Sequence, residues 1–373
     1  MNPLHQLEAL GQSIWYDNIS RTILDNGGLQ EMVAQGLLGV TSNPTIFEKA
    51  IAGSDAYDPQ IRSMLRATPS LKTETMLQTL MVEDIRRAAD ILLPVYQRTG
   101  GRDGYVSIEV TPTKARDTAA TNLEAQELWD RVGRPNTMIK IPATREGLPA
   151  ITQAISEGIN VNVTLIFSVE RYDEVADAYL SGLEQRSRGG KPLSHIASVA
   201  SVFVSRIDTM VDDQLGAKIQ HAKGEDSDRL RGLAGKAAVA NTKLIYQAFK
   251  RIFSSPRFLA LQKEGATVQR PLWGSTGTKN SAYSDLLYVD TLIGPHTVNT
   301  VPPATYTAIL SHCKPALTVE SDIEGARQTL AALRAAGIDM GRVLDTLERD
   351  GVAAFAKSFD GLTRNLDTKR TAV

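Results

Sequence analysis

The residues best suited to chemistry are one lysine and two acids near the ends of short apolar runs. Lys140 lies inside 138–142, a run typical of a buried strand. Burying an ammonium group is costly, so such a lysine is either paired with an acid or neutral. A neutral lysine amine is a nucleophile that forms Schiff bases with ketones. The alternatives are a lysine on an edge strand or a salt bridge in the core.

Eight short strand-like runs recur along the chain and are separated by longer helical patterns. They are 13–17, 39–43, 105–110, 137–142, 160–167, 197–204, 269–273 and 297–301. Strands that alternate with helices predict a parallel sheet. Eight of them favour a closed α/β fold, the (β/α)8 TIM barrel, and the rival is an open doubly wound sheet.

We expect one barrel domain over 1–373, with helical insertions near 54–97 and 212–265 and a helical C-terminal tail over 304–369. The tail carries two helical patterns. Its first apolar positions are Ile323, Ala326, Leu330 and Leu333, which predict a helix that packs across the barrel. The spacing from Leu344 to Phe355 predicts a final long helix.

Strand alternation places polar side chains of six runs on one face. They are Asp17, Thr41, Asn43, Ser107, Glu109, Lys140, Asn160, Asn162, Thr164 and Ser201. Most lie near the C-terminal ends of their runs, where barrel enzymes assemble their sites. Asp17 could instead cap a helix, Asn43 could start a turn and Thr164 could merely fill a strand. Together, Lys140 could activate a ketone while Asp17 and Glu109 act as acid/base groups.

Two cations follow the later strands, where barrels commonly bind phosphate. Arg206 follows the sixth run, and Lys279 lies in the glycine-containing segment 274–280 after the seventh. That segment matches neither the P-loop spacing nor the dinucleotide fingerprint, so nucleotide binding is not predicted. The alternative for the segment is an ordinary turn.

Composition excludes several functional classes. The chain has 373 residues, 42% hydrophobic and 22% charged, with a formal net charge of -1. We therefore predict no nucleic-acid and no membrane partner. The five histidines show no metal-ligand spacing, so we predict no metal. The only cysteine, Cys313, fits a reducing compartment, and we expect a cytoplasmic protein whose oligomeric state the sequence does not report.

Six segments of the chain form a specific series of motifs. They are 15–21 (WYDNISR), 39–44 (GVTSNP), 106–110 (VSIEV), 138–144 (MIKIPAT), 158–168 (GINVNVTLIFS) and 201–208 (SVFVSRID). The series resembles the transaldolases, a family of class I aldolase barrels. The likeness follows the right order over nearly the whole chain. It implies transfer of a dihydroxyacetone unit from sedoheptulose 7-phosphate to glyceraldehyde 3-phosphate, yielding erythrose 4-phosphate and fructose 6-phosphate in the pentose phosphate pathway. It implies no cofactor.

The resemblance also implies catalytic roles for four of the polar residues. Lys140 would form the Schiff base and Asp17 would be the acid/base at the cleaved bond. Glu109 and Thr164 would hold the catalytic water.

The same resemblance implies substrate-binding residues. Asn43 and Asn162 would bind dihydroxyacetone hydroxyls, Ser201 would line the site, and Arg206 would hold the substrate phosphate.

Two positions refine the expectation from the family. The family places an arginine for phosphate after the seventh strand, whereas this sequence has Lys279, which supplies charge but no bidentate fork. The shorter fructose 6-phosphate aldolases resemble a variant with tyrosine at the position of Phe203. The phenylalanine in this sequence therefore favours transfer over hydrolytic release. The extra isomerase domain of fused family members is not expected.

The alternatives to a transaldolase are a Schiff-base aldolase or dehydratase for another phosphorylated carbonyl compound, and a non-catalytic barrel that binds sugar phosphates.

Overall fold

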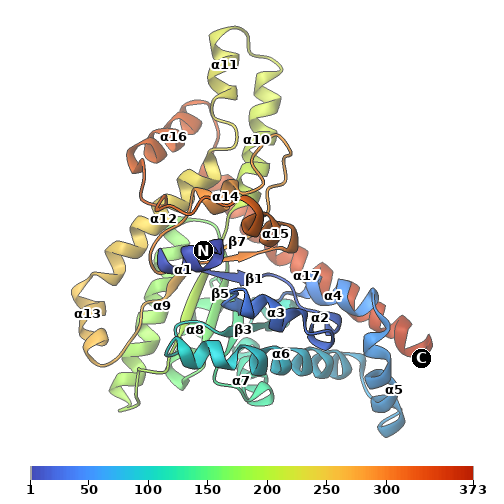
Figure 1. Cartoon of the computed structure of the whole chain (residues 1–373). Helices are drawn as coiled ribbons and strands as arrows, with labels where there is room; N and C mark the ends of the chain where they lie inside the picture. The colour runs from blue at the N-terminus through green and yellow to red at the C-terminus, as the bar shows by residue number, and fades with distance from the viewer. Residues whose placement is uncertain (1, 373) are drawn as a thin grey trace.

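Eight parallel strands close into a barrel in the computed structural model, which describes residues 2–372 (Figure 1). The strands are β1 (Gln12–Tyr16), β2 (Gly39–Val40), β3 (Tyr105–Glu109), β4 (Thr137–Pro142), β5 (Val161–Ile166), β6 (Ser198–Phe203), β7 (Arg270–Gly274) and β8 (Thr297–Val301). Each strand pairs with the next, and β1 pairs with β8 to close the ring. The predicted (β/α)8 barrel with additional helices is confirmed, and the open sheet is excluded.

Helices surround the barrel and extend beyond it. They are α1 (Pro3–Ala9), α2 (Arg21–Asp25), α3 (Gly28–Ala34), α4 (Pro44–Ala52), η1 (Asp55–Tyr57), α5 (Asp58–Ala67), α6 (Thr73–Arg98), η2 (Pro112–Lys114), α7 (Thr118–Val132), α8 (Gly147–Glu157), α9 (Val169–Arg188), α10 (Ser205–Ile219), α11 (Glu225–Arg231), α12 (Ala237–Phe253), α13 (Pro256–Lys263), α14 (Leu287–Asp290), α15 (Pro303–His312), α16 (Ile323–Ala335) and α17 (Met340–Ala372). Both predicted insertions and the tail contain helices, and the assignment of one domain stays a prediction. No described helix is long and apolar enough to cross a membrane.

Local sequence signals set the strand-to-helix transitions at the C-terminal end of the barrel. Side-chain oxygens cap three following helices: Ser20 accepts from the amide of Ile23, Asn43 from that of Ile46 and Ser168 from that of Arg171. An N-cap accepts a hydrogen bond that the first helical turn cannot satisfy internally. The second strand consequently ends at Val40, earlier than expected, and the cap of α2 is Ser20 instead of Asp17.

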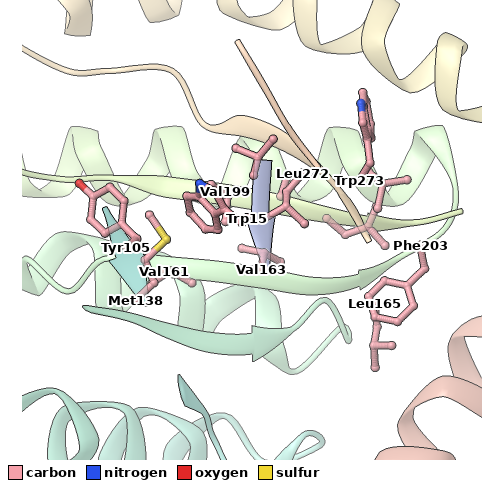
Figure 2. Packing of buried hydrophobic residues seen from close by; sticks show 14 of the residues in the cluster. Trp15, Tyr105, Met138, Val161, Val163, Leu165, Val199, Phe203, Leu272 and Trp273 are labelled. Carbon is pink, nitrogen blue, oxygen red and sulfur yellow. The ribbon is translucent and has the colours of Figure 1, made fainter. Parts of the chain in front are cut away.

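The barrel interior is filled by side chains from alternate positions of the strands. Figure 2 shows Trp15, Tyr105, Met138, Val199 and Leu272 among these packed residues, and all five are at most 2% exposed. Alternation explains why a buried strand can still aim polar side chains inward at its end.

The alternation of β5 breaks at Leu165. This residue has a φ of 64°, and the register between β5 and β6 shifts between Val163 and Ile166. A non-glycine residue with positive φ is uncommon and needs support from its surroundings. The Leu165 side chain packs against α17, where an added Cβ on Gly351 would lie 2.9 Å from Leu165 Cδ2.

The two tail helices take different places from those expected. The predicted packing of 323–333 across the barrel is wrong, because α16 packs against α12 at the side of the molecule (Figure 1). The longer α17 contacts α4, α6, α10 and β5 instead. An ion pair holds the C-terminal end of α17, because Lys369 Nζ lies 2.9 Å from Asp58 Oδ1. The last helix therefore covers the C-terminal end of the barrel.

Candidate active site

A cavity of about 280 Å³ opens at the C-terminal end of the barrel under α17. Seven of the ten predicted site residues line it, namely Asp17, Asn43, Lys140, Ser201, Phe203, Arg206 and Lys279. The other three, Glu109, Asn162 and Thr164, are buried in the barrel wall beside them. Residues far apart in the sequence thus meet in one place.

Lys140 is a buried amine with an acid, a carbonyl and an aromatic ring around it. Its side chain is 5% exposed, and Nζ lies 3.3 Å from Glu109 Oε2. Nζ donates to the Ser42 carbonyl at 3.2 Å and lies 5.5 Å from the centre of the Phe355 ring. Lys140 therefore forms a buried salt bridge with Glu109, which was one of the alternatives for this lysine. The same amine also reaches the cavity, as a nucleophile must.

Glu109 is held ready to take up or release a proton near neutral pH. Its side chain is 1% exposed, and burial raises the pKa of this carboxyl to about 7 although Lys140 opposes the rise. A carboxyl with such a pKa is suited to general acid/base catalysis. The neighbouring β3 and β4 pair Glu109 with Lys140 in register, which fixes their contact.

Asp17 lies at the end of β1 and keeps part of its surface open to the cavity. Burial raises its pKa, while the charge of Lys140 and a hydrogen bond from Thr41 oppose the rise. Thr41 Oγ1 donates to Asp17 Oδ1 at 2.8 Å and lies 2.5 Å from Thr300 Oγ1. Asp17 and Glu109 are thus two acids that both interact with the charge of one lysine, and each has a raised pKa.

An amide and two hydroxyls form a hydrogen-bonded chain that links β6, β5 and β3. Ser201 Oγ donates to Asn162 Oδ1 at 2.6 Å, and Asn162 Nδ2 donates to Ser107 Oγ at 3.0 Å. The chain fixes the orientation of the Asn162 amide. Thr164 lies two residues after Asn162 on β5, and its Oγ1 is buried without a hydrogen-bond partner in residues 2–372.

The mouth of the cavity carries cations. Arg206 is part-buried, and burial lowers its pKa. Within 2–372 it has no ion pair, and its guanidinium lies 5.4 Å from the centre of the Phe203 ring. Lys279 and Lys49 also line the mouth and are exposed. This arrangement attracts an anion.

Sequence reasoning missed Lys49, Thr300 and Phe355. Thr300 is the second-last residue of β8, so strand position could have found it. Lys49 and Phe355 come from α4 and α17, and only the packing of these helices against each other brings them to the cavity. Phe355 lies against Phe203 with ring centres 6.3 Å apart.

Asn43 lies both at the start of a helix and in the wall of the cavity. Its Oδ1 caps α4 by accepting from the Ile46 amide at 3.0 Å, and the residue also lines the cavity.

The described residues contain no cluster of three or more His, Cys, Asp or Glu side chains that could hold a metal.

Comparison with known proteins points the same way. The family model described as Transaldolase/Fructose-6-phosphate aldolase matches residues 14–366. A protein named Transaldolase from Trichodesmium erythraeum is 48% identical over 99% of this chain and 97% of its own length. Transaldolase 2 from Nostoc sp. is 48% identical over 99% of this chain and 98% of its own. A protein named Transaldolase from Thermobifida fusca is 50% identical over 97% of this chain and 96% of its own length.

Proposed function

Because the chain belongs to the transaldolase/fructose-6-phosphate aldolase family, we propose that it is a transaldolase of the pentose phosphate pathway. It transfers a dihydroxyacetone unit from sedoheptulose 7-phosphate to glyceraldehyde 3-phosphate, which gives erythrose 4-phosphate and fructose 6-phosphate. The observation that carries the proposal is one buried lysine amine that opens into a cavity beside two acids.

Lys140 starts the reaction by attacking the ketone carbon of the donor sugar. The amine must first lose a proton, and Glu109 Oε2 at 3.3 Å is placed to take it. The carbinolamine then loses water to give an iminium. Glu109 Oε1 and Thr164 Oγ1 are buried without hydrogen-bond partners in 2–372, which supports a role for both in holding that water.

Asp17 acts at the carbon–carbon bond that breaks. It takes the proton from the C4 hydroxyl while the electron pair of the C3–C4 bond moves into the iminium, which becomes an enamine. Erythrose 4-phosphate leaves. The enamine carbon then attacks the aldehyde of glyceraldehyde 3-phosphate, and Asp17 returns the proton to the new hydroxyl.

Polar groups around the amine hold the three carbons that stay bound. Asn43, Asn162 and Ser201 offer amides and a hydroxyl to the dihydroxyacetone hydroxyls. Arg206 binds the phosphate, which is supported by the absence of an acidic partner for it among the described residues, and Lys279 adds charge.

Two aromatic rings favour transfer over hydrolysis. Phe203 and Phe355 pack against each other, and Phe355 lies over the Lys140 amine. Neither ring supplies a hydroxyl that could help water compete for the enamine or the iminium. We also propose that the protein acts in the cytoplasm on free sugar phosphates, which its net charge of -1 and single cysteine support.

Borohydride trapping tests the proposal. Fructose 6-phosphate with borohydride should add one reduced dihydroxyacetone unit to Lys140, located by peptide mass spectrometry. Lys140→Met should remove the added mass, whereas Lys49→Met, a matched change in the same cavity, should retain it. No adduct, or an adduct on another lysine, would refute Schiff-base catalysis. An adduct without transfer to glyceraldehyde 3-phosphate would refute only the transaldolase assignment.

A further inference from the structure

A second cavity, of about 330 Å³, lies at the opposite, N-terminal end of the barrel. It is bounded by the N-terminal ends of strands and by the loops that precede them: 100–102 before β3, 194–197 before β6 and 266–268 before β7. Its volume falls in the range of about 300–1,000 Å³ that is typical of small-molecule sites. The proposed reaction leaves this cavity without a function.

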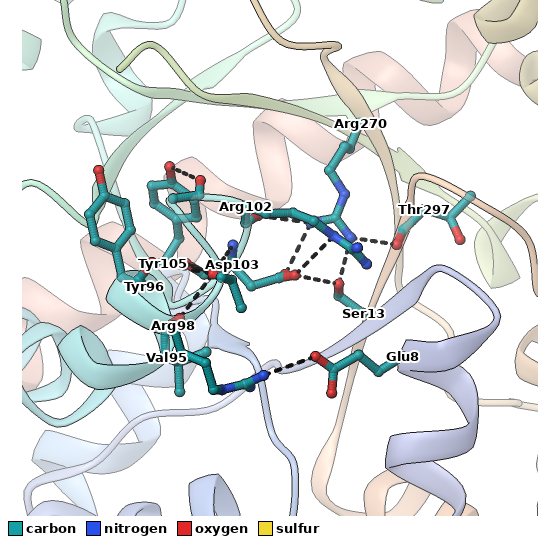
Figure 3. A network of polar contacts seen from close by, with 12 residues as sticks. Glu8, Ser13, Val95, Tyr96, Arg98, Arg102, Asp103, Tyr105, Arg270 and Thr297 are labelled. Atoms are coloured by element: carbon teal, nitrogen blue, oxygen red, sulfur yellow. Dashed lines mark hydrogen bonds and ion pairs between the residues drawn. The ribbon is translucent and has the colours of Figure 1, made fainter. Parts of the chain in front are cut away.

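Most of its wall is apolar and aromatic. Met138, Val199 and Ile196 are buried side chains that face it. Tyr96 and Tyr105 form an edge-to-face pair on one side, with ring centres 5.4 Å apart and planes at 84° (Figure 3). Such a wall suits a flat apolar ring, because aromatic pairs prefer offset or edge-to-face contact.

The charged groups of the wall are all basic. Arg102 and Arg270 line the cavity and converge on Asp103, whose carboxylate is not part of the lining (Figure 3). One carboxylate facing two arginines leaves one positive charge. Burial and both arginines lower the pKa of His296, so this neighbouring ring adds no charge near neutral pH.

Arg270 also keeps a free donor. The residue is 6% exposed; its Nη1 donates to Asp103 Oδ1 at 3.0 Å and its Nη2 to the Thr297 carbonyl at 2.9 Å. Its Nε is buried and has no hydrogen-bond partner within 2–372. A buried donor without a partner is costly, and a small movement of the guanidinium towards the cavity would let an acceptor on a ligand satisfy it.

We propose that this cavity binds a small flat apolar molecule that carries one negative charge, such as an aromatic carboxylate. The ring lies between the tyrosine pair and the aliphatic wall, and the anionic group lies towards Arg102 and Arg270. The excess of one positive charge over the carboxylate sets the preference for a monoanion.

The site lies close to the proposed catalytic cavity. On β4, Met138 faces the N-terminal cavity and Lys140 the catalytic one; on β6 the same holds for Val199 and Ser201. Two residues of strand span about 6.6 Å. A ligand in the N-terminal cavity and a sugar phosphate in the catalytic cavity would therefore be separated by roughly one layer of barrel side chains. Each of the two cavities has its own opening.

Isothermal titration calorimetry with 2-naphthoate tests the proposal on the full chain. We expect one site with a Kd at or below about 1 mM, the value expected for a ligand of this size. The neutral 2-naphthamide should bind about fivefold more weakly, because it lacks the charge. A saturating concentration of fructose 6-phosphate should leave the 2-naphthoate affinity unchanged.

Variants separate the two parts of the proposal. Arg102→Gln should weaken 2-naphthoate about fivefold and leave 2-naphthamide unchanged. Arg98→Gln is the matched control, an exposed arginine outside the cavity, and should change neither. Ala197→Phe should weaken both ligands at least tenfold by filling the cavity. Val268→Trp, from a neighbouring loop, serves the same purpose if thermal melting shows the first variant to be unfolded.

Three results would overturn the proposal. The first is no binding of 2-naphthoate, or displacement by fructose 6-phosphate, which would place it in the catalytic cavity. The second is unchanged binding to the folded cavity-filling variant. The third is equal affinity for 2-naphthamide and 2-naphthoate, which would refute the preference for an anion.

Discussion

Replacing Glu109 with glutamine tests whether its carboxyl group sets the pH dependence of the reaction. Burial raises the pKa of Glu109 to about 7, so about one tenth of this carboxyl is ionised at pH 6 and about one hundredth at pH 5. If the ionised form is the base, log kcat/KM should fall by about one for each pH step below 7. The fall should steepen where Asp17, whose pKa is also raised, takes up its proton. Glu109→Gln should lower turnover by about 10²–10⁴-fold and remove the limb near pH 7.

The same substitution changes how stability depends on pH. The pKa of Glu109 is about 7 in the folded chain against an ordinary 4.5. Between these values the folded chain holds a proton that the unfolded chain has released. The contribution of Glu109 to the free energy of unfolding is therefore fully present below pH 4.5 and is lost as the pH rises through 7, a change of about 3 kcal/mol. Glutamine does not titrate, so the variant should lack this decline.

Two measurements check the prediction. A coupled assay with an NADH-linked readout gives kcat/KM from pH 5 to 9, and urea unfolding gives the free energy of unfolding over the same range. Glu348→Gln is the control, because Glu348 also has a pKa raised by burial but contacts Arg171 outside the catalytic cavity. Persistence of the limb near pH 7 in Glu109→Gln would refute the assignment of Glu109 as the base.

Four further substitutions have defined outcomes. Lys140→Met should abolish turnover and change the free energy of unfolding by less than about 2 kcal/mol in urea titrations, because Glu109 can become neutral once its partner is gone. Arg206→Gln should raise KM for fructose 6-phosphate about 10–100-fold and leave kcat with unphosphorylated fructose nearly unchanged in steady-state assays. Phe203→Tyr should increase release of free dihydroxyacetone relative to transfer, as measured by product chromatography. Tyr283→Phe removes a hydrogen bond of 2.8 Å to Asp212 from the loop that carries Lys279, and should raise KM about fivefold with kcat unchanged.

The sequence predicts the barrel, and seven of its ten candidate site residues line one cavity, because both depend on local patterns. Strand alternation and strand ends are visible in runs of five or six residues, and they were enough to bring Asp17, Glu109 and Lys140 together. The strand ends themselves were less accurate. The second strand stops at Val40 because Asn43 caps α4, and side-chain capping competes with strand pairing in a way that alternation does not report.

Long-range packing supplied what the sequence could not. Phe355 lies 5.5 Å from the Lys140 amine only because α17 returns across the barrel end and packs against α4. The helical pattern of the tail predicted helices correctly but gave no information on which of the two covers the barrel. The positive φ of Leu165 is likewise not predicted, since nothing in the run 160–167 indicates an irregular strand; its side chain packs against Gly351 on α17.

In the part of the chain that the structure describes, a buried ion pair lies at each end of the barrel, and the choice of cation in each follows from what that end must do. At the N-terminal end Arg270 pairs with Asp103, and Ser13 and Trp15 also donate to this carboxylate. At the catalytic end a lysine faces Glu109, whose Oε1 has no hydrogen-bond partner within 2–372. Arginine cannot lose its proton in a protein and makes several hydrogen bonds in a fixed plane, whereas lysine can become a neutral nucleophile. Exchanging the two cations would therefore cost catalysis at one end and hydrogen bonds at the other, although the net charge of the barrel interior would be unchanged.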